Sequence, residues 1–337
     1  MKRAVTDTLE GSLKEQRTQD AEEVVDQSDD GVLEEFRDRP TRKTTESTSR
    51  AASANNCPIQ PPKIKGPHMW FQTTQVEHMY TITQCLRTLL TNTEIVFSPH
   101  GMRIANPDPT HICFVDLRIT VDTLEEGIYI CNHDYRIAMD MDEFGNLMKM
   151  AKCDEFLVYE LRGPDPDYMQ MRTFQDTRIG NHGIRLNDVD ESHSVIPSLS
   201  YNNQVIMLSS EFKHAINLFK TDSTIKHITL EKTSTRFSIK AKNMRSTFCY
   251  DYYADVDETV RIQNDPDDLD AVLSGKFSLN KLINFARVTK ATKYVSINLP
   301  EMCDGGETTK PLRIKYDLAA LGDITFLLAP YVDEETD

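Results

Sequence analysis

Apolar residues recur at helical spacing in four segments of the chain, all beyond residue 68. In the first, Met79, Ile82 and Leu86 fall on one face, as the i, i+3, i+4 period of a helix requires. The third segment shows the same spacing at Phe212 and Ile216. The predicted helices span residues 75–90, 142–152, 210–220 and 279–290.

Shorter stretches alternate between apolar and polar residues, which is the period of a half-buried strand. Residues 113–119 and 156–161 are examples. Helices and strands recur at a constant offset: Glu77 and Glu211 near the starts of two helices are 134 residues apart, and Leu147 and Leu282 in the other two are 135 apart. We therefore predict an α+β protein made of two similar halves, each with a few helices and many antiparallel strands.

The chain divides by composition. Residues 1–67 contain one aromatic residue, Phe36, and too few apolar residues to offset the entropy of ordering, so we predict a disordered tail. The first domain is expected over 68–186, a polar connector over 187–204, the second domain over 205–332, and an acidic tail over 333–337. The connector contains one apolar island, at 195–197, which favours a binding role for it.

Overall charge narrows the classes of function. The 337 residues carry a formal net charge of -15, which argues against a simple basic nucleic-acid binder and against an anionic membrane surface. No apolar run is long enough to cross a membrane, and the first residues do not resemble a secretory signal. The seven dispersed cysteines include no CxxC pair, which favours a reducing compartment over a disulfide scaffold or zinc module. We expect a soluble intracellular protein.

Basic residues gather on the predicted helices, which are net +4, whereas the rest of residues 68–337 is net -17. Bases near helix ends also complement the helix dipole, and this remains an alternative explanation for any one of them. However, all four predicted helices lack acidic residues in their later turns, which favours a surface that binds the phosphates of a nucleic acid. The predicted DNA-binding residues are Arg87, Lys149, Lys152, Lys213, Lys220, Lys281, Arg287 and Lys290.

Candidate catalytic chemistry is sparse. Asp140, Asp142 and Glu143 resemble a carboxylate cluster for a divalent metal. If residues 139–141 end a strand that leads into a helix, Asp142 and Glu143 are N-terminal capping acids, and this interpretation is favoured. No HExxH, GxSxG or phosphate-loop pattern is found. We expect no enzymatic activity, no metal and no cofactor. A metal-dependent nuclease using these three carboxylates is the rival from another class.

Five sequence pieces resemble the proliferating cell nuclear antigen family of DNA sliding clamps. They are the C-terminal Phe-Leu-Leu-Ala-Pro-Tyr-Val-Asp-Glu at 326–334, the helix at 277–289, the strands at 94–105, the Asp-x-x-His turn and strand at 108–117, and the helix start at 210–212. The connector, with its Val-Ile-Pro at 195–197 and Tyr201, resembles the interdomain connecting loop of the family. The likeness extends over about residues 69–334.

This resemblance implies a homotrimeric ring of two-domain subunits, with antiparallel sheets outside and helices lining a hole that holds duplex DNA. It implies that Arg87, Lys149 and Arg287 face DNA. It also implies a groove for partner peptides at Ile112, Phe114, Ile196, Pro197, Tyr201, Leu328, Ala329 and Pro330. The implied partners are non-sequence-specific double-stranded DNA, a DNA polymerase and other proteins with clamp-binding peptides, a clamp loader and the chain itself, with no membrane.

The resemblance further implies work in DNA replication and repair, in the nucleus or at a viral replication site. Ring closure is expected through the strand edges at 184–187 and 247–251. Pro107 and Ser194 stand where apolar groove residues are usual in the family, so partner preference is expected to differ. A subunit of a heteromeric checkpoint-type clamp and a monomeric processivity factor remain alternatives.

Overall fold

The computed structural model describes residues 60–332 apart from 125–126, 190–198, 255–258, 267–268, 270 and 301–309. Contacts divide the chain into Met1–Arg50 and Ala51–Asp337, and every described residue belongs to the second unit. Ile196 and Pro197 of the predicted groove, Ser194, most of the predicted N-terminal tail and the acidic C-terminal tail lie outside the described residues. Among those described, no helix is long and apolar enough to cross a membrane.

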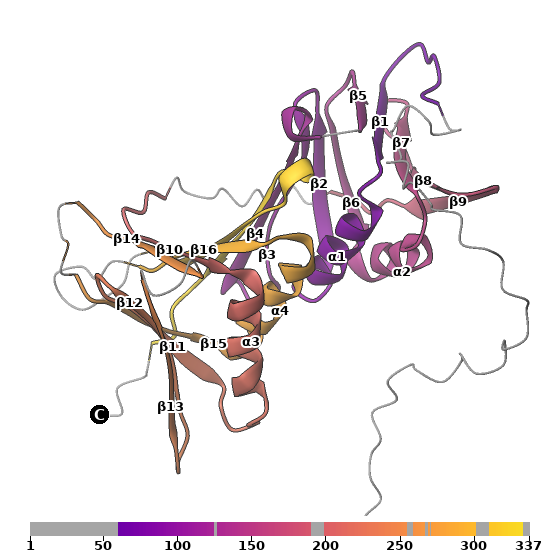
Figure 1. Cartoon of the computed structure of the whole chain (residues 1–337). Helices are drawn as coiled ribbons and strands as arrows, with labels where there is room; N and C mark the ends of the chain where they lie inside the picture. Colours follow the sequence, from indigo (N-terminus) through magenta and orange to yellow (C-terminus); the bar gives the residue numbers. More distant parts are fainter. Residues whose placement is uncertain are drawn as a thin grey trace, which may run out of the picture. The chain divides into compact units, whose positions relative to one another are not determined.

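The first half contains two helices and nine strands (Figure 1). They are β1 His68–Thr73, α1 Val76–Leu86, β2 Asn92–Ser98, β3 Gly101–Pro107, β4 Cys113–Thr120, β5 Ile128–Cys131, β6 Tyr135–Asp140, α2 Met141–Ala151, β7 Phe156–Arg162, β8 Tyr168–Gln175 and β9 Arg178–Arg185, with a 3-10 turn at Val121–Thr123. The predicted helices at 75–90 and 142–152 are thus confirmed, the first of them shorter at its end because the Thr88 hydroxyl bonds back to the Cys85 carbonyl.

The second half repeats this order of elements. It comprises β10 Gln204–Leu208, α3 Ser209–Lys220, β11 His227–Lys232, β12 Arg236–Lys242, β13 Thr247–Tyr253, β14 Val260–Gln263, β15 Leu273–Ser278, α4 Leu279–Phe285, β16 Tyr294–Asn298, β17 Leu312–Asp317 and β18 Asp323–Leu328, with 3-10 turns at Ala286–Ala291 (η3) and Ala319–Leu321. Eleven elements therefore match one to one. Their starts are 132 residues apart at the closest (Ile128 and Val260) and 145 at the farthest (Arg178 and Asp323), so the predicted repeat is confirmed.

The predicted fourth helix differs in its second part. The α-helix ends at Phe285 and continues as the 3-10 turn η3. The Thr289 hydroxyl donates to the Ala286 carbonyl at 2.7 Å, a local bond that suits the tighter i to i+3 turn better than a regular helix.

The strands form three antiparallel sheets. One has five strands in the order β5-β1-β7-β8-β9, one has four in the order β13-β12-β11-β15, and one has nine in the order β14-β10-β16-β17-β18-β4-β3-β2-β6. The nine-stranded sheet is thus a five-strand unit and a four-strand unit, one from each half, fused where β18 pairs with β4. The α+β class with antiparallel sheets is confirmed.

One apolar core runs through both halves beneath the sheets. The inward faces predicted for α1 and α3 are buried, and the stacked rings of Phe285 and Phe326, 4.4 Å apart, join α4 to β18. Apolar residues at helical spacing face the sheets, so the opposite, polar side of each helix is left for solvent or a ligand.

Candidate nucleic-acid and partner-binding surfaces

The helices pack as one continuous row across both halves. α2 packs on α1, α1 on η3, and η3 on α3 and α4 (Figure 1). The approach of α2 to α1 is close, because a Cβ added at Gly145 would lie 2.7 Å from the Cδ atom of Arg87. The outer faces of four helical segments that are far apart in sequence therefore form one surface.

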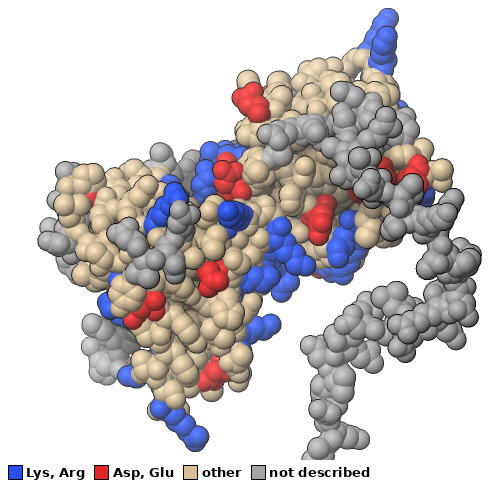
Figure 2. Space-filling model, in the orientation of Figure 1, with Lys and Arg blue, Asp and Glu red and all other residues tan. Residues whose placement is uncertain are grey.

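Most of the predicted DNA-binding cations lie exposed along this row. Figure 2 shows Lys and Arg side chains gathering where the helices lie. The exposed ones are Lys149, Lys152, Lys220, Arg287 and Lys290, and Lys213 is half-buried. The ammonium of Lys152 lies 5.3 Å from the centre of the Tyr80 ring, which keeps that charge over the helix surface.

Arg87 is engaged within the row. Its Nε donates to Asp142 at 2.6 Å and its Nη1 to Asn146 at 3.1 Å. Because the Asp142 carboxylate is largely exposed, this ion pair contributes little to stability. It holds the guanidinium between α1 and α2 and neutralises part of its charge.

Lys281 lies apart from the other seven cations. Its ammonium pairs with the carboxylate of Asp108, a residue of the first half, and only 16% of its side chain is exposed. The structure therefore places Lys281 between the two halves rather than on the outer face of the row.

The three carboxylates at the start of α2 form a helix cap. One oxygen of Asp140 accepts from the backbone amides of Asp142 and Glu143, at 2.8 Å each. The helix-start interpretation is confirmed, but its assignment is corrected: Asp140 is the capping residue, whereas Asp142 and Glu143 lie in the first turn and supply the amides that it binds. Among the described residues, no group of three or more His, Cys, Asp or Glu side chains is placed to hold a metal ion.

The described residues of the predicted peptide groove meet at one end of three adjacent strands. Leu327 lies opposite Phe114 where β18 pairs with β4, and the Ala329 amide donates to the Ile112 carbonyl at 2.9 Å. Ile112 is 43% exposed, whereas Leu328 is 1% exposed. Ile112, Ala329 and Pro330 thus form the accessible surface, and Leu328 supports it from the core.

Tyr201 is fixed at the same end of the sheet. Its hydroxyl donates to the Pro311 carbonyl at 2.6 Å, and the Arg313 guanidinium lies 4.4 Å from its ring centre. Pro311 precedes Leu312, which lies opposite Leu328 in the β17–β18 pair. Tyr201 therefore lies close to the C-terminal segment.

Among the described strands, six end a sheet: β5, β9, β14, β6, β13 and β15. Two of these edges are the ones predicted to close the ring. β9 ends the five-stranded sheet and β13 ends the four-stranded one. Large apolar side chains lie exposed on or beside these edges, with Ile179 and Tyr168 at 50% and Phe248 and Tyr250 at 37%. The predicted closure edges at 184–187 and 247–251 overlap these strands, and exposed apolar side chains on an open edge are typical of an association surface.

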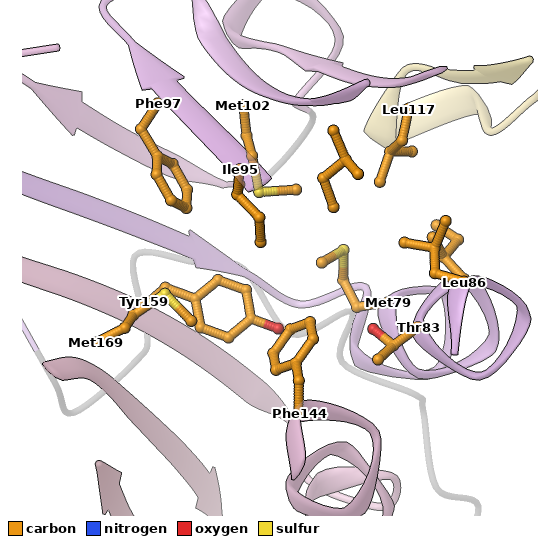
Figure 3. Close-up of a pocket in the computed structure, with 12 residues that line it drawn as sticks. Met79, Thr83, Leu86, Ile95, Phe97, Met102, Leu117, Phe144, Tyr159 and Met169 are labelled. Atoms are coloured by element: carbon orange, nitrogen blue, oxygen red, sulfur yellow. The ribbon is translucent and has the colours of Figure 1, made fainter. Parts of the chain in front are cut away.

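An enclosed cavity lies inside the first half, between the helices and the sheets (Figure 3). Its lining is almost wholly apolar and includes Met79, Ile95, Met102, Phe144 and Tyr159. Its volume of about 10 Å³ is close to the smallest space that holds one water molecule. It is a packing defect of the core and not a ligand site.

Sequence reasoning missed the role of Asp108. Its carboxylate is fully buried and accepts from Lys281, from the Thr110 hydroxyl, and from the Cys113 amide at 2.8 Å. Burial alone would raise the pKa of Asp108. The hydrogen bonds from Lys281, Thr110 and the Cys113 amide lower it by more than burial raises it, so the pKa of Asp108 lies below the usual value. The available signal was the sequence Pro-Asp-Pro-Thr, typical of a turn closed by an Asp side chain.

Comparison with known proteins gives a consistent answer. Residues 71–195 match the model of the N-terminal domain of proliferating cell nuclear antigen. A probable DNA polymerase sliding clamp of Paramecium bursaria Chlorella virus 1 is 22% identical over 267 residues, which cover 77% of this chain and 95% of the relative. The proliferating cell nuclear antigen of Chaetomium thermophilum is 20% identical over 265 residues, covering 77% and 97%.

A solved structure extends the match to the fold. The crystal structure of proliferating cellular nuclear antigen from Entamoeba histolytica superposes with a TM-score of 0.66 at 18% identity, covering 78% of this chain and 99% of the other. The described elements thus have the two-domain sliding-clamp fold. The resemblance to the proliferating cell nuclear antigen family is confirmed, and it covers nearly the whole folded part of the chain.

Proposed function

We propose that this chain is the subunit of a DNA sliding clamp, a ring of three copies that encircles duplex DNA and tethers a polymerase. One observation carries the proposal. The strand pair that joins the two halves, β18 with β4, has a counterpart in the internal repeat, β9 and β13, whose strands are not paired with each other within the chain. The matches to proteins named as sliding clamps support it.

The joined copy is the antiparallel pair of β18 and β4, which aligns six residues of each strand. In the internal repeat, β9 is the counterpart of β18 and β13 is the counterpart of β4. Pairing of β9 in one subunit with β13 in the next would reproduce this junction between chains. Such head-to-tail contacts close into a ring when the rotation per subunit permits it.

Charge favours this pairing over the alternatives. β9 carries Arg178 and Arg185, whereas β13 carries Asp251 and no basic residue. Like charges directly across a strand pair are destabilising, so two copies of β9 are poor partners for each other. A β9 edge is therefore expected to pair with a β13 edge rather than with another β9 edge, and a closed ring requires this head-to-tail pairing.

The helix row is proposed as the DNA-facing surface. Its exposed lysines and Arg287 neutralise phosphates without reading bases, so contact with DNA is independent of sequence and weakens with salt. Outside the four predicted helices, residues 68–337 carry a net charge of -17, which disfavours DNA binding elsewhere on the chain. Weak, sequence-independent contacts let a ring slide.

The surface formed by Ile112, Phe114, Ala329 and Pro330, with Tyr201 nearby, is proposed as the docking site for partner peptides. A short segment with an aliphatic anchor and aromatic residues fits an apolar site of this kind. The proposed partners are a DNA polymerase, other replication and repair proteins, and a clamp loader. The proposed location is the nucleus or a viral replication site, and we propose no catalytic activity and no cofactor.

The test combines mass in solution with polymerase processivity. Light scattering at micromolar concentration is expected to give the mass of three chains, and the protein is expected to lengthen the products of a cognate polymerase on primed circular DNA. A monomer that still raises processivity would replace the ring with a monomeric factor. A requirement for two different partner chains would indicate a heteromeric checkpoint-type clamp, and magnesium-dependent DNA cleavage would indicate a nuclease.

A further inference from the structure

Lys281 and Asp108 connect the helix row to the groove end of the sheet. Lys281 is on α4, in the second half, and Asp108 follows β3, in the first half, 173 positions away. The Asp108 carboxylate is fully buried, and 16% of the Lys281 side chain is exposed. An ion pair removed from water in this way is costly to break, because the remaining charge stays buried without a partner.

Asp108 organises the loop that leads into β4. Its second oxygen accepts from the Cys113 amide, and its backbone amide donates to the Cys113 carbonyl at 2.8 Å. Its carbonyl accepts from the amide of His111, which has a left-handed φ of 57°. This conformation is uncommon for a residue other than glycine, although histidine is one of those that adopt it more often, and here the bond to Asp108 stabilises it.

The ordered loop presents Ile112 and fixes the C-terminal segment. Ile112 is the residue of the loop with a large exposed apolar side chain, and its carbonyl accepts from the Ala329 amide. The positions of Ile112 and Ala329 therefore both depend on the loop that Asp108 holds. Lys281 supplies the charge that keeps the Asp108 carboxylate ionised in the interior.

We propose that Lys281 is a positioning residue for the partner-peptide groove and not a DNA contact. Its ammonium holds Asp108, Asp108 holds the loop, and the loop sets the distance between Ile112 and Ala329. The inference deepens the proposed function and depends on it for the identity of the ligand. The proposed role distinguishes Lys281 from Lys290 of η3, which has the same charge but is exposed.

The test compares Lys281→Met with the matched control Lys290→Met, each of which removes one positive charge from the same helical segment. The probe is a synthetic polymerase-derived peptide with an aliphatic anchor and two aromatic residues, titrated by calorimetry into the full-length protein. Lys281→Met is expected to weaken binding by about tenfold or more, and Lys290→Met by less than about twofold. Lys281→Arg, which keeps the charge, is expected to restore most of the affinity.

A second measurement does not require the peptide. Hydrogen exchange at the Cys113 and Ala329 amides is expected to accelerate in Lys281→Met and to stay at the wild-type rate in Lys290→Met. Absence of peptide binding to the wild type would overturn the proposed groove, while the exchange rates would still decide the role of Lys281. If Lys281→Met does not fold, Asp108→Asn replaces it in both measurements.

Any of three results would overturn the inference. One is wild-type peptide affinity together with unchanged exchange at both amides in a folded Lys281→Met protein. Another is a lower melting temperature without any change in affinity or local exchange, which would show that the ion pair contributes only to global stability. The third is loss of polymerase processivity in Lys281→Met at wild-type peptide affinity, which would show that Lys281 is a DNA contact.

Discussion

The ring proposal makes a quantitative prediction at the open edge β13. Phe248 and Tyr250 point to the same side of this strand as the core, and each packs edge-on against Phe219, at 6.5 and 5.5 Å between ring centres. Each keeps 37% of its surface exposed in the single chain. Replacing both with alanine removes apolar surface that a neighbouring β9 would cover.

The magnitude follows from that exposed surface. A large aromatic side chain offers roughly 200 Å² of surface, so 37% of it is about 75 Å² for each residue. At about 25 cal/mol per Å², full coverage stabilises the contact by about 2 kcal/mol for one residue and about 4 kcal/mol for both. The double variant is therefore expected to associate up to about a thousandfold more weakly at each interface.

The assay is sedimentation equilibrium over a dilution series of the full-length protein. The wild type is expected to stay trimeric at concentrations where Phe248→Ala/Tyr250→Ala is mostly monomeric. Tyr294→Ala is the matched control, because Tyr294 is 42% exposed but belongs to β16, a strand with a neighbour on each side. Truncation also uncovers Phe219, so the melting temperature of each variant is recorded. Equal association constants for the wild type, the double variant and the control would refute edge pairing at β13.

Three further predictions concern the other surfaces. Ile112→Ser is expected to weaken the peptide titration by about 1 kcal/mol, because it removes exposed apolar surface at the groove; unchanged affinity would place the groove elsewhere. The double variant Lys149→Glu/Lys290→Glu is expected to reduce processivity and to lower the slope of log K against log salt concentration for DNA binding by about 2. An unchanged slope would assign both lysines to compensation of the helix dipole. Burial raises the pKa of the Cys85 thiol to about 12. At pH 8, iodoacetamide is therefore expected to label the exposed Cys153 and to spare Cys85, as measured by mass spectrometry. Equal labelling of the two cysteines would contradict the burial of Cys85.

Local pattern was enough to predict the helices, most of the strands and their duplication. Met79, Ile82 and Leu86 repeat at helical spacing and are all buried, since a helix between solvent and core must place its apolar residues on one face. The helix start at 142–143 was also predictable from local sequence, although the capping side chain is Asp140, which binds the amides two and three positions away, and not Asp142 or Glu143. The family resemblance extended these local patterns to a whole architecture.

Local pattern did not predict the contacts that Lys281 and Leu328 make with residues distant in the chain. Lys281 was grouped with the other basic residues, yet its flexible side chain turns toward Asp108, 173 positions away, and no local spacing signals that pair. Leu328 was assigned to the groove through the family resemblance, whereas its pairing with Cys113 and Leu312 buries it. Burial of these residues is decided by strand order, which depends on the whole fold.

The fusion of β18 with β4 has a consequence for how a ring of such chains comes apart. In the proposed ring, half of the sheet junctions would lie within a polypeptide, where the two strands are held at a high effective concentration whatever the amount of protein present. The other half would join separate molecules and obey mass action. Dilution, or a factor that binds the free edge of β9 or β13, therefore acts on one class of junction and leaves the other intact. An opening wide enough to admit DNA would form at a subunit boundary, and each subunit would keep its own pair of domains joined throughout.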